Sequence, residues 1–291
     1  MIAVRLQGRL GNQLFQYAFA CTASKKIGTG FYLDQYLEKS LVHQYFQIEV
    51  KTVEAISLAL FNINGYKNFF NHYTRRQLNK CAAYFYRFKK KEYGYALDQS
   101  VVEVEDHTLY IRYFQSLLLL RPFENMIRQK LTIKTEISQA FKDRFSELYR
   151  ANTIVTVHVR RTDYKNLGHL NLGGDDLSLP LKYYQTALST VAGKNLHYIF
   201  ISDDTAFVEA NFAGIQPKTI SVENEICDFQ HLLNADICIT SNSSFSWWGA
   251  WLNEKESKVV YCPKYYVGFH LKKEIPLNIY PKEWRQIGFN E

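Results

Sequence analysis

TIVTVHVRRTDY, residues 153 to 164, is the stretch that decides the fold. Its first five residues are all β-branched, as in a buried β-strand, so Arg160, Arg161 and Asp163 follow the end of that strand. Ligands of open α/β sheets bind at the carboxyl ends of the strands, and a guanidinium group is a planar, permanently charged fork of donors. We therefore expect a diphosphate site here, with a solvated strand end salt-bridged to Asp163 as the alternative.

Strands and helices alternate regularly beyond this stretch. Predicted strands cover LHYIFI (196–201), TIS (219–221), DICIT (236–240) and KVVYC (258–262), the last one before Pro263. Predicted helices cover 180–191, with Ser178 as the cap and Pro180 in the first turn, then ICDFQHLLNA (226–235) and SFSWWGAWLN (244–253). This layout predicts a parallel sheet with helices on both faces.

Three of these strands end in polar clusters, which a parallel sheet would bring to one edge. Asp203 or Asp204 is expected to accept hydrogen bonds from a ribose or a base, with a plain helix cap as the alternative for 202–204. Ser243 and Ser244 would bind phosphate at a helix N-terminus. Tryptophans at 247 and 251 are expected to pack inward, whereas Trp248 beside polar residues is costly for a simple cap.

The N-terminal half opens with a predicted strand (2–6), the turn QGRLGNQ (7–13), a helix to residue 26 and a second strand at 31–34. Gly8 and Gly11 would let the backbone approach a ligand at the helix N-terminus. Asn12 and Gln13 carry amides that can donate to a phosphate or sugar oxygen, and a simple N-cap is the alternative. The third glycine of the dinucleotide fingerprint is missing.

Residues 37–98 are rich in aromatic and basic side chains. A helix there would turn Leu78, Ala82 and Phe85 inward and leave bases outside, at Arg75, Arg76, Lys80, Arg87 and 89–91. A solvated face is the ordinary interpretation, and a membrane surface or an anionic acceptor is the alternative. A strand and helix follow at TLYIRYFQS and LLLLRPF, and a boundary near 150 divides the chain into domains 1–150 and 151–291.

Composition restricts the possible partners. The 291 residues are 47% hydrophobic and 22% charged with a net charge of +7, which indicates a globular protein attracted to anions. No nucleic-acid-binding motif accompanies that charge. The five cysteines lack C-x-x-C spacing, and no apolar run reaches the ~18 residues of a membrane span, which predicts a reduced, cytoplasmic protein without zinc. Contact with the inner face of the membrane stays open.

HVRRTDY resembles the H-x-R-R-x-D motif of the bacterial α-1,2-fucosyltransferases. QGRLGNQLFQYAFA (7–20), YFQS (113–116) and NSSFSWWGAWL (242–252) resemble three further motifs of that family, in the family's order. Thr162 is a departure, because many relatives have glycine there. Threonine is expected to be tolerated if its φ is negative.

The resemblance implies an α/β fold that is GT-B-like, with two Rossmann-like domains and the donor site in the cleft. Residues 1–150 would form the acceptor side, and 151–291 would bind the GDP-sugar. The implied reaction moves L-fucose from GDP-L-fucose to the 2-hydroxyl of a terminal galactose, with inversion, in surface glycan synthesis. The acceptor would be a galactose-terminated oligosaccharide or a lipid-linked glycan, and no cofactor or metal is expected.

The resemblance also implies roles for single residues. Arg160 would be the main diphosphate ligand, with Asp163 or His158 as the candidate general base. Donor positioning falls to His158, Arg161 and Asn12 with its neighbours Gly8, Gly11 and Gln13. The nucleotide would be bound by Asp203, Asp204, Asn242, Ser243, Ser244 and Phe245. Adjacent Asp175 and Asp176 suggest a lid or acceptor loop rather than a metal site.

Other functions remain as alternatives. The arginines would contact the nucleotide more than the sugar, so another GDP-sugar or another linkage fits as well. A non-catalytic nucleotide- or glycan-binding protein is a second alternative. Glycoside hydrolysis needs two carboxylates positioned across a cleft, and no such pair is evident in the sequence. Nucleic-acid binding rests on net charge alone.

Overall fold

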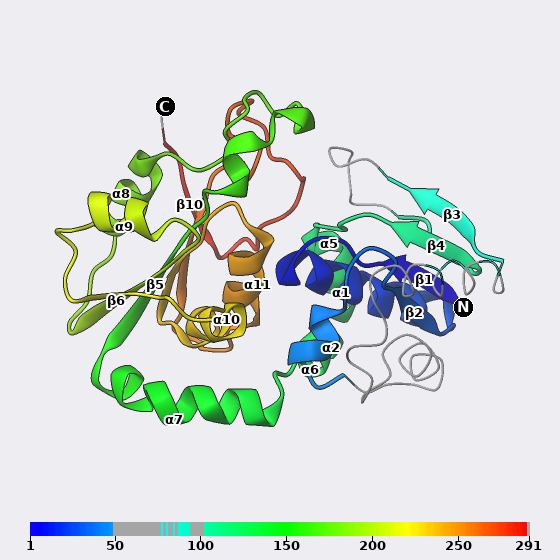
Figure 1. The fold of residues 1–291 in the computed structure, drawn as a ribbon, viewed down its shortest axis with the longest axis horizontal. Helices are drawn as coiled ribbons and strands as arrows, with labels where there is room; N and C mark the ends of the chain where they lie inside the picture. The colour runs from blue at the N-terminus through cyan, green and yellow to red at the C-terminus, as the bar shows by residue number, and fades with distance from the viewer. Residues whose placement is uncertain (49–76, 78–79, 81–83, 85–86, 94–101, 290–291) are drawn as a thin grey trace. The chain divides into compact units, whose positions relative to one another are not determined.

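A computed structural model describes residues 1–48, 77, 80, 84, 87–93 and 102–289 (Figure 1). The chain divides into two compact units, unit 1 (Met1–Lys134) and unit 2 (Thr135–Glu291). This division comes before helix α7 (Thr135–Ala151), which belongs to unit 2, whereas the boundary that the sequence predicted near 150 lies at the end of that helix. Phe141 of α7 packs 5.0 Å from the ring of His231, so this helix is held by the C-terminal half of the chain.

Unit 1 contains a parallel sheet of four strands in the order β2-β1-β4-β3. The strands are β1 (Ile2–Arg5), β2 (Phe31–Asp34), β3 (Lys89–Glu92) and β4 (Thr108–Ile111). Helix α1 (Leu10–Ile27) connects β1 to β2, which confirms the predicted strand-helix-strand opening. Gly28, with φ of 66°, ends α1 in the left-handed conformation that glycine adopts without strain.

The helix predicted to include residues 89–91 is wrong, because these lysines lie on β3 and pair with β4. An edge strand satisfies its backbone on one side while its charged side chains stay in water. Residues 75, 76, 78, 82 and 85 of the same prediction lie outside the described residues. Short helices complete the unit: α2 (Leu41–Tyr45), α5 (Leu117–Leu120), η1 (Arg121–Phe123) and α6 (Glu124–Lys130).

Unit 2 contains a parallel sheet of six strands in the order β10-β9-β8-β5-β6-β7. The strands are β5 (Thr153–Val159), β6 (Leu196–Ser202), β7 (Lys218–Ile220), β8 (Ile237–Ile239), β9 (Val259–Pro263) and β10 (Arg285–Ile287). Counted from β5, this is the 3-2-1-4-5-6 order of the Rossmann fold. The five predicted strands are confirmed, but β10 adds a sixth after the strand that we expected to be the last.

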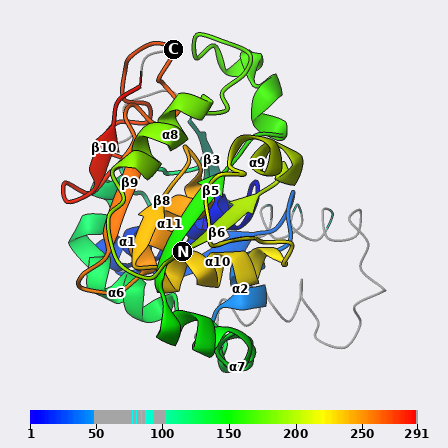
Figure 2. The ribbon, with the colours of Figure 1, turned by 90° about the vertical axis from the view of Figure 1, so that its left-hand side faces the viewer.

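Helices α8 (Leu181–Ser189) and α9 (Thr205–Asn211) cover one face of this sheet, and α10 (Glu225–Asn234) and α11 (Ser244–Leu252) cover the other (Figure 2). The predicted Ser178 cap of α8 is wrong, because Pro180 occupies the N-cap position. Ser178 instead donates its backbone N–H to Asp176 Oδ1 at 2.8 Å. Fully buried side chains of β5, β6 and β8 form the core between the layers, including Val155, Phe200 and Ile239.

Neighbouring strands β5 and β8 form the switch point of unit 2, where the strand order reverses. Ligands of such sheets bind in the crevice outside the carboxyl ends of the strands at this point. Residues 160–164 follow β5 there, and residues 240–244 follow β8 beside them. Asp203 follows β6, the other neighbour of β5. The fold therefore brings the three polar clusters to one sheet edge, as the sequence predicted.

Candidate active site

A hydrogen bond crosses the switch point between His158 and Ser241. His158 Nδ1 lies 2.8 Å from Ser241 Oγ, and the imidazole is 5% exposed. The ring packs 5.5 Å from the ring of Phe245 on α11. Burial, helped by the positive charge of Arg160, lowers the pKa of His158 to about 3. The imidazole is therefore neutral near pH 7 and binds as a hydrogen-bonding group, not as a cation.

Two carboxylates hold the guanidinium group of Arg160. Its Nη2 lies 2.6 Å from Asp163 Oδ2, and its Nη1 lies 3.2 Å from Asp203 Oδ2. Burial lowers the pKa of Arg160, but the hydrogen bond to Asp163 and the charge of Asp203 outweigh it, so the pKa is raised. The result is a fixed cation, 13% exposed, at the carboxyl end of β5.

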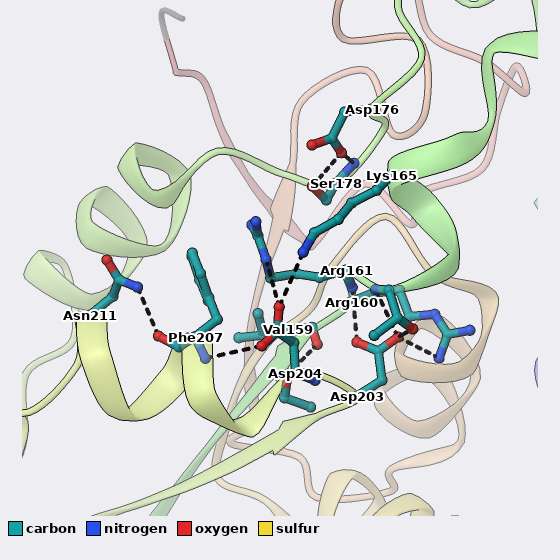
Figure 3. Close-up of polar contacts among 12 residues, drawn as sticks. Val159, Arg160, Arg161, Lys165, Asp176, Ser178, Asp203, Asp204, Phe207 and Asn211 are labelled. Atoms are coloured by element: carbon teal, nitrogen blue, oxygen red, sulfur yellow. Dashed lines mark hydrogen bonds and ion pairs between the residues drawn. The ribbon is translucent and has the colours of Figure 1, made fainter.

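The side chain of Arg161 points away from that of Arg160 and packs against α9. Its Cζ lies 3.8 Å from the ring centroid of Phe207, and its Nε lies 3.4 Å from Asp204 Oδ2. Figure 3 shows the guanidinium groups of Arg160 and Arg161 pointing apart. Successive residues of an extended segment point to opposite sides, so adjacent arginines do not form one double fork. Of the two, Arg160 is the one presented at the switch point.

Asp203 holds the turn that carries the arginines. Its carboxylate accepts hydrogen bonds from the backbone N–H groups of Arg161 at 2.9 Å and Thr162 at 3.2 Å, and from the Thr162 hydroxyl (Figure 3). Burial raises the pKa of Asp203, but these hydrogen bonds and the charge of Arg160 outweigh it and lower the pKa. The carboxylate of Asp203 thus binds this turn in the structure, and its expected contact with a ribose or a base stays a prediction.

Thr162 has φ of −53°, which any residue adopts without strain. Threonine is therefore tolerated at this position, and its hydroxyl adds a contact to Asp203 that glycine cannot make. Asp204 is the N-cap of α9 and accepts from the backbone N–H of Phe207 at 3.1 Å. The alternative that residues 202–204 form a helix cap is thus correct for Asp204.

The segment after β8 combines capping with burial. Ser243 is the N-cap of α11, and its Oγ accepts from the backbone N–H of Phe245 at 3.3 Å. Asn242 is fully buried and donates its amide to the carbonyl of Leu177 at 2.8 Å. The backbone carbonyl of Asn242 accepts a hydrogen bond from the hydroxyl of Tyr164 at 3.1 Å, and this bond joins the segments that follow β5 and β8. Ser244 is the first residue of α11.

The tryptophans of this segment are core residues. Trp247 and Trp251 are 1% and 3% exposed, which confirms their inward packing. Trp248 is also fully buried, with its ring 5.1 Å from each of the other two. Packing in this core therefore explains why a tryptophan stands beside polar residues at position 248.

The glycine turn of unit 1 (residues 7–13) depends on close packing of Gly8 and Asn12. Gly8 has φ of 74°, and a Cβ there would lie 2.5 Å from Asn12 Nδ2, so only glycine fits. Arg9 occupies the N-cap position of α1, so Asn12 is not the cap but a residue of the first turn. Asn12 Oδ1 accepts from Gln115 Nε2 at 2.8 Å, which gives the YFQS segment a function that the sequence did not reveal.

Gln13 is bound to the backbone at both ends of its amide. Its Nε2 donates to the carbonyls of Gly8 at 3.1 Å and Lys39 at 3.0 Å, and its Oε1 accepts from the N–H of Leu41 at 2.7 Å. At 1% exposure it stabilises the turn, and its expected contact with the donor stays a prediction. Gly11 lies buried within α1 and packs in the helix rather than opening the turn.

Asp175 and Asp176 shape the loop before α8. The Asp175 carbonyl accepts from the N–H of Leu167 at 2.8 Å, and Asp176 binds Ser178. Within the described part of the chain, no group of three or more His, Cys, Asp or Glu side chains is placed to hold a metal ion. None of the helices in that part is both long and apolar enough to cross a membrane.

Sequence reasoning missed the partners of the predicted residues. Ser241, Tyr164 and Gln115 each bind a residue that was singled out, yet their own pattern was that of a strand end or a core residue. Ser241 had a detectable signal, since it directly follows a predicted strand and lies in one of the predicted polar clusters. All three pair with residues far away in the sequence, so only the fold reveals the pairs.

Two units with parallel sheets, one in Rossmann order and bearing an arginine at its switch point, define the class of GT-B-like glycosyltransferase folds. A crystal structure of NodZ alpha-1,6-fucosyltransferase soaked with GDP-fucose has this fold, with a TM-score of 0.52, 13% identity, and coverage of 86% of this chain and 92% of that chain. The structure of NodZ from Bradyrhizobium gives a TM-score of 0.51 at 11% identity, covering 85% of this chain and 91% of that one.

Residues 1–288 match Glycosyl transferase family 11, and the chain belongs to that family. This confirms the resemblance to the fucosyltransferase family. The O-antigen biosynthesis glycosyltransferase WbnK of Escherichia coli is 26% identical over 302 residues, covering 94% of this chain and 97% of the relative. An alpha-1,2-colitosyltransferase of Escherichia coli is 25% identical over 275 residues, covering 90% of this chain and 91% of the relative. The chain is thus a glycosyltransferase of glycan synthesis.

Proposed function

We propose that this glycosyltransferase moves L-fucose from GDP-L-fucose to the 2-hydroxyl of a terminal β-galactoside, with inversion, during synthesis of a surface glycan. The observation that carries the proposal is the fixed guanidinium of Arg160 at the switch point, in a chain of this family. A relative named for alpha-1,2 transfer and another named for O-antigen biosynthesis support the linkage and the pathway.

Arg160 is the proposed catalytic cation. As the bond between the sugar and the β-phosphate breaks, negative charge grows on the departing GDP. A guanidinium that two carboxylates already hold in place needs no reorganisation to stabilise that charge, so its contribution is larger in the transition state than in the ground state. Arg161 assists by fixing the other side of the turn on Phe207 and Asp204.

The general base is assigned to Asp163 rather than His158. His158 is 5% exposed and its Nδ1 lies 2.8 Å from Ser241 Oγ, so a sugar hydroxyl has little access to the imidazole. The side chain of Asp163 is 55% exposed, so its carboxylate can receive an acceptor hydroxyl while it still contacts Arg160. His158 is then a positioning residue that links the two strand ends through Ser241.

The remaining donor contacts are proposed from position. Phe245 lies beside His158, and Ser244 opens α11, whose N-terminus favours negative charge. Asn12 is the proposed neutral contact from unit 1, held by Gln115 on a turn that requires glycine at Gly8. No step of this scheme uses a metal ion.

The test measures GDP release from GDP-L-fucose with lactose as acceptor, with and without EDTA. We expect acceptor-dependent release that persists in EDTA, and a product whose NMR spectrum shows an α-1,2 linkage. Release without a fucosylated product, or loss of turnover in EDTA, contradicts the proposal. We also propose a cytoplasmic location, which the free thiols of Cys227, Cys238 and Cys262 support, and cell fractionation tests it together with contact at the inner membrane.

Transfer of colitose from its GDP-sugar is the second candidate, because one relative is an alpha-1,2-colitosyltransferase. Colitose differs from fucose by the loss of one hydroxyl group, so a contact to that hydroxyl decides between them. A site that hydrogen-bonds a sugar hydroxyl rejects the analogue lacking it strongly, whereas an apolar pocket does not. Competition between the two donors in one reaction gives the ratio of their kcat/KM values directly.

A further inference from the structure

Unit 2 also has a pocket, which shares none of the residues assigned to the active site. It encloses about 610 Å³ between α8 and the segments that follow β9 and β10. This volume is within the range of about 300–1,000 Å³ that is typical of small-molecule sites. Its side chains include Lys182, Lys264, Lys272, Tyr265, His270 and Phe289.

Three lysines give this pocket its charge. Lys182 comes from α8, whereas Lys264 and Lys272 come from the segment after β9. Among the residues that the structure describes, no carboxylate forms an ion pair with any of the three. Uncompensated cations around a concave surface focus positive potential, so the pocket attracts an anionic group.

Aromatic rings form another part of the wall. Tyr265 and Tyr266 have φ of 72° and 54°, a costly conformation for bulky side chains that persists only where the surroundings enforce it. Buried Tyr266 packs 5.8 Å from the ring of Tyr280 and thereby holds Tyr265 in the pocket wall. Phe289 is held 5.6 Å from the ring of Phe269. Partly exposed rings such as these suit the apolar face of a sugar.

We propose that this pocket binds a monosaccharide unit that carries a phosphate or a carboxylate group. A neutral sugar would leave the lysines without a counter-charge, and a bare anion would leave the rings without a partner. A charged sugar would contact the lysines with its anionic group and the aromatic rings with its apolar face. That the unit belongs to the acceptor glycan rests on the proposed function, whereas the binding itself does not.

The pocket is connected to the arginine turn (residues 158–164) through His270. Its Nε2 lies 2.8 Å from the Asp176 carbonyl, and a Cβ at Gly174 would lie 3.1 Å from the same nitrogen. The next residue, Leu177, donates its N–H to the carbonyl of Tyr164 at 2.8 Å and accepts from Asn242. One loop therefore contacts both His270 of the pocket wall and the arginine turn.

Calorimetric titration of the full chain in the presence of saturating GDP tests the proposal. The probes are galactose 1-phosphate, glucuronic acid, galactose and inorganic phosphate. We expect at least one of the charged sugars to bind at least about tenfold more tightly than galactose or inorganic phosphate, a difference of about 1.4 kcal/mol. The tighter of the two charged sugars identifies phosphate or carboxylate as the natural group.

Lysine variants localise the binding. The double variant Lys182→Gln, Lys264→Gln is expected to weaken the charged sugar about tenfold or more, while Lys282→Gln, exposed and outside the pocket, leaves it unchanged. Unchanged binding in the double variant overturns the proposal, as does equally tight binding of galactose or of inorganic phosphate. The readout is heat of binding, so a failure of fucosyl transfer does not affect it.

Discussion

The glycine turn of unit 1 and the arginine turn of unit 2 occupy equivalent positions, because each follows the first strand of a parallel sheet. Neutral amides fix the first turn. Gln13 binds three backbone groups, and Gln16 joins the N–H of Gln7 to the carbonyl of Arg112. Carboxylates fix the second, through Asp163 and Asp203. The same position in the fold is thus stabilised by two kinds of chemistry.

The glycine turn is held by neutral groups that fix its shape, whereas the arginine turn is held by charged groups. Amide hydrogen bonds do not titrate and are little affected by salt, so the glycine turn offers a rigid neutral surface over a wide range of conditions. The arginine turn presents a cation, and the pKa values of its partner Asp203 and of the buried His158 are both lowered, so the contribution of these two groups to stability depends on pH. We expect substitutions in the arginine turn to affect chemistry first, and substitutions in the glycine turn to affect stability first.

The largest effect is expected from Arg160→Ala. Loss of a fixed donor that stabilises transition-state charge lowers the rate about 10²–10³-fold, or about 2.7–4 kcal/mol. Asn12→Ala removes a neutral contact and is expected to cost only about tenfold. Steady-state kcat/KM with GDP-L-fucose and lactose measures both, and Arg150→Ala, in an exposed ion pair with Glu147, is the control.

An equal loss in Arg160→Ala and Asn12→Ala would contradict the division between charge and shape. Arg160→Lys sharpens the test, because lysine keeps the charge without the planar fork. We expect the kcat/KM of Arg160→Lys to lie between that of Arg160→Ala and that of the wild type. Full activity in Arg160→Lys would mean that charge alone is sufficient.

The sequence predicted the strands of unit 2 and their polar ends because those signals are local. β-branched runs such as 153–157, followed by polar residues, have one plausible structure in an alternating chain. The partners of those polar residues depend on contacts between strands. Asp203 binds the turn at Arg161 and Thr162, a contact that follows from β5 and β6 being neighbours in register.

Unit 1 shows the same limit. The glycine turn was predicted from its sequence motif. The hydrogen bonds of Gln13 to the backbone of Lys39 and Leu41 could not be predicted, because these residues lie in a loop that is distant in sequence. Strand β3 was taken for a helix because lysine-rich edge strands carry no apolar alternation. β10 was missed because three residues on a sheet edge leave almost no signal.

Gln13→Ala is the second prediction and concerns stability. The substitution leaves three backbone groups in a buried site without their partner, at about 1 kcal/mol each, so we expect the free energy of unfolding to fall by about 3 kcal/mol. Urea denaturation measures the change. Gln139→Ala, an exposed amide on α7, is the matched control and should change stability little. A loss of kcat with unchanged stability would instead assign Gln13 to the donor site.

The third prediction concerns pH. The pKa of His158 falls from its ordinary 6.5 to about 3 in the folded chain, so between these values the unfolded chain binds more protons. Stability is therefore complete above pH 6.5 and falls as the pH falls through this window. His158→Gln should reduce that slope by on the order of 1 kcal/mol per pH unit.

Urea unfolding at several pH values measures this slope. His43 and His231 also have lowered pKa values, of about 4, so the variant is expected to lose part of the acid sensitivity and not all of it. Above pH 7 the variant should show the same flat dependence as the wild type. An unchanged slope between pH 6.5 and 4 would show that His158 is not buried as a neutral group.

The smallest effect is expected at Thr162, whose hydroxyl helps to hold Asp203 against the arginine turn. Thr162→Val removes the hydrogen bond to Asp203 and should cost about 1 kcal/mol or less of stability, because the site is exposed and water replaces the hydroxyl. Thr162→Ser keeps the hydroxyl and should match the wild type. Two backbone N–H groups still hold Asp203 in both variants, so kcat/KM is expected to stay within about threefold. A large loss of activity in Thr162→Val alone would mean that the position of Asp203, and with it that of Arg160, depends on this one hydroxyl.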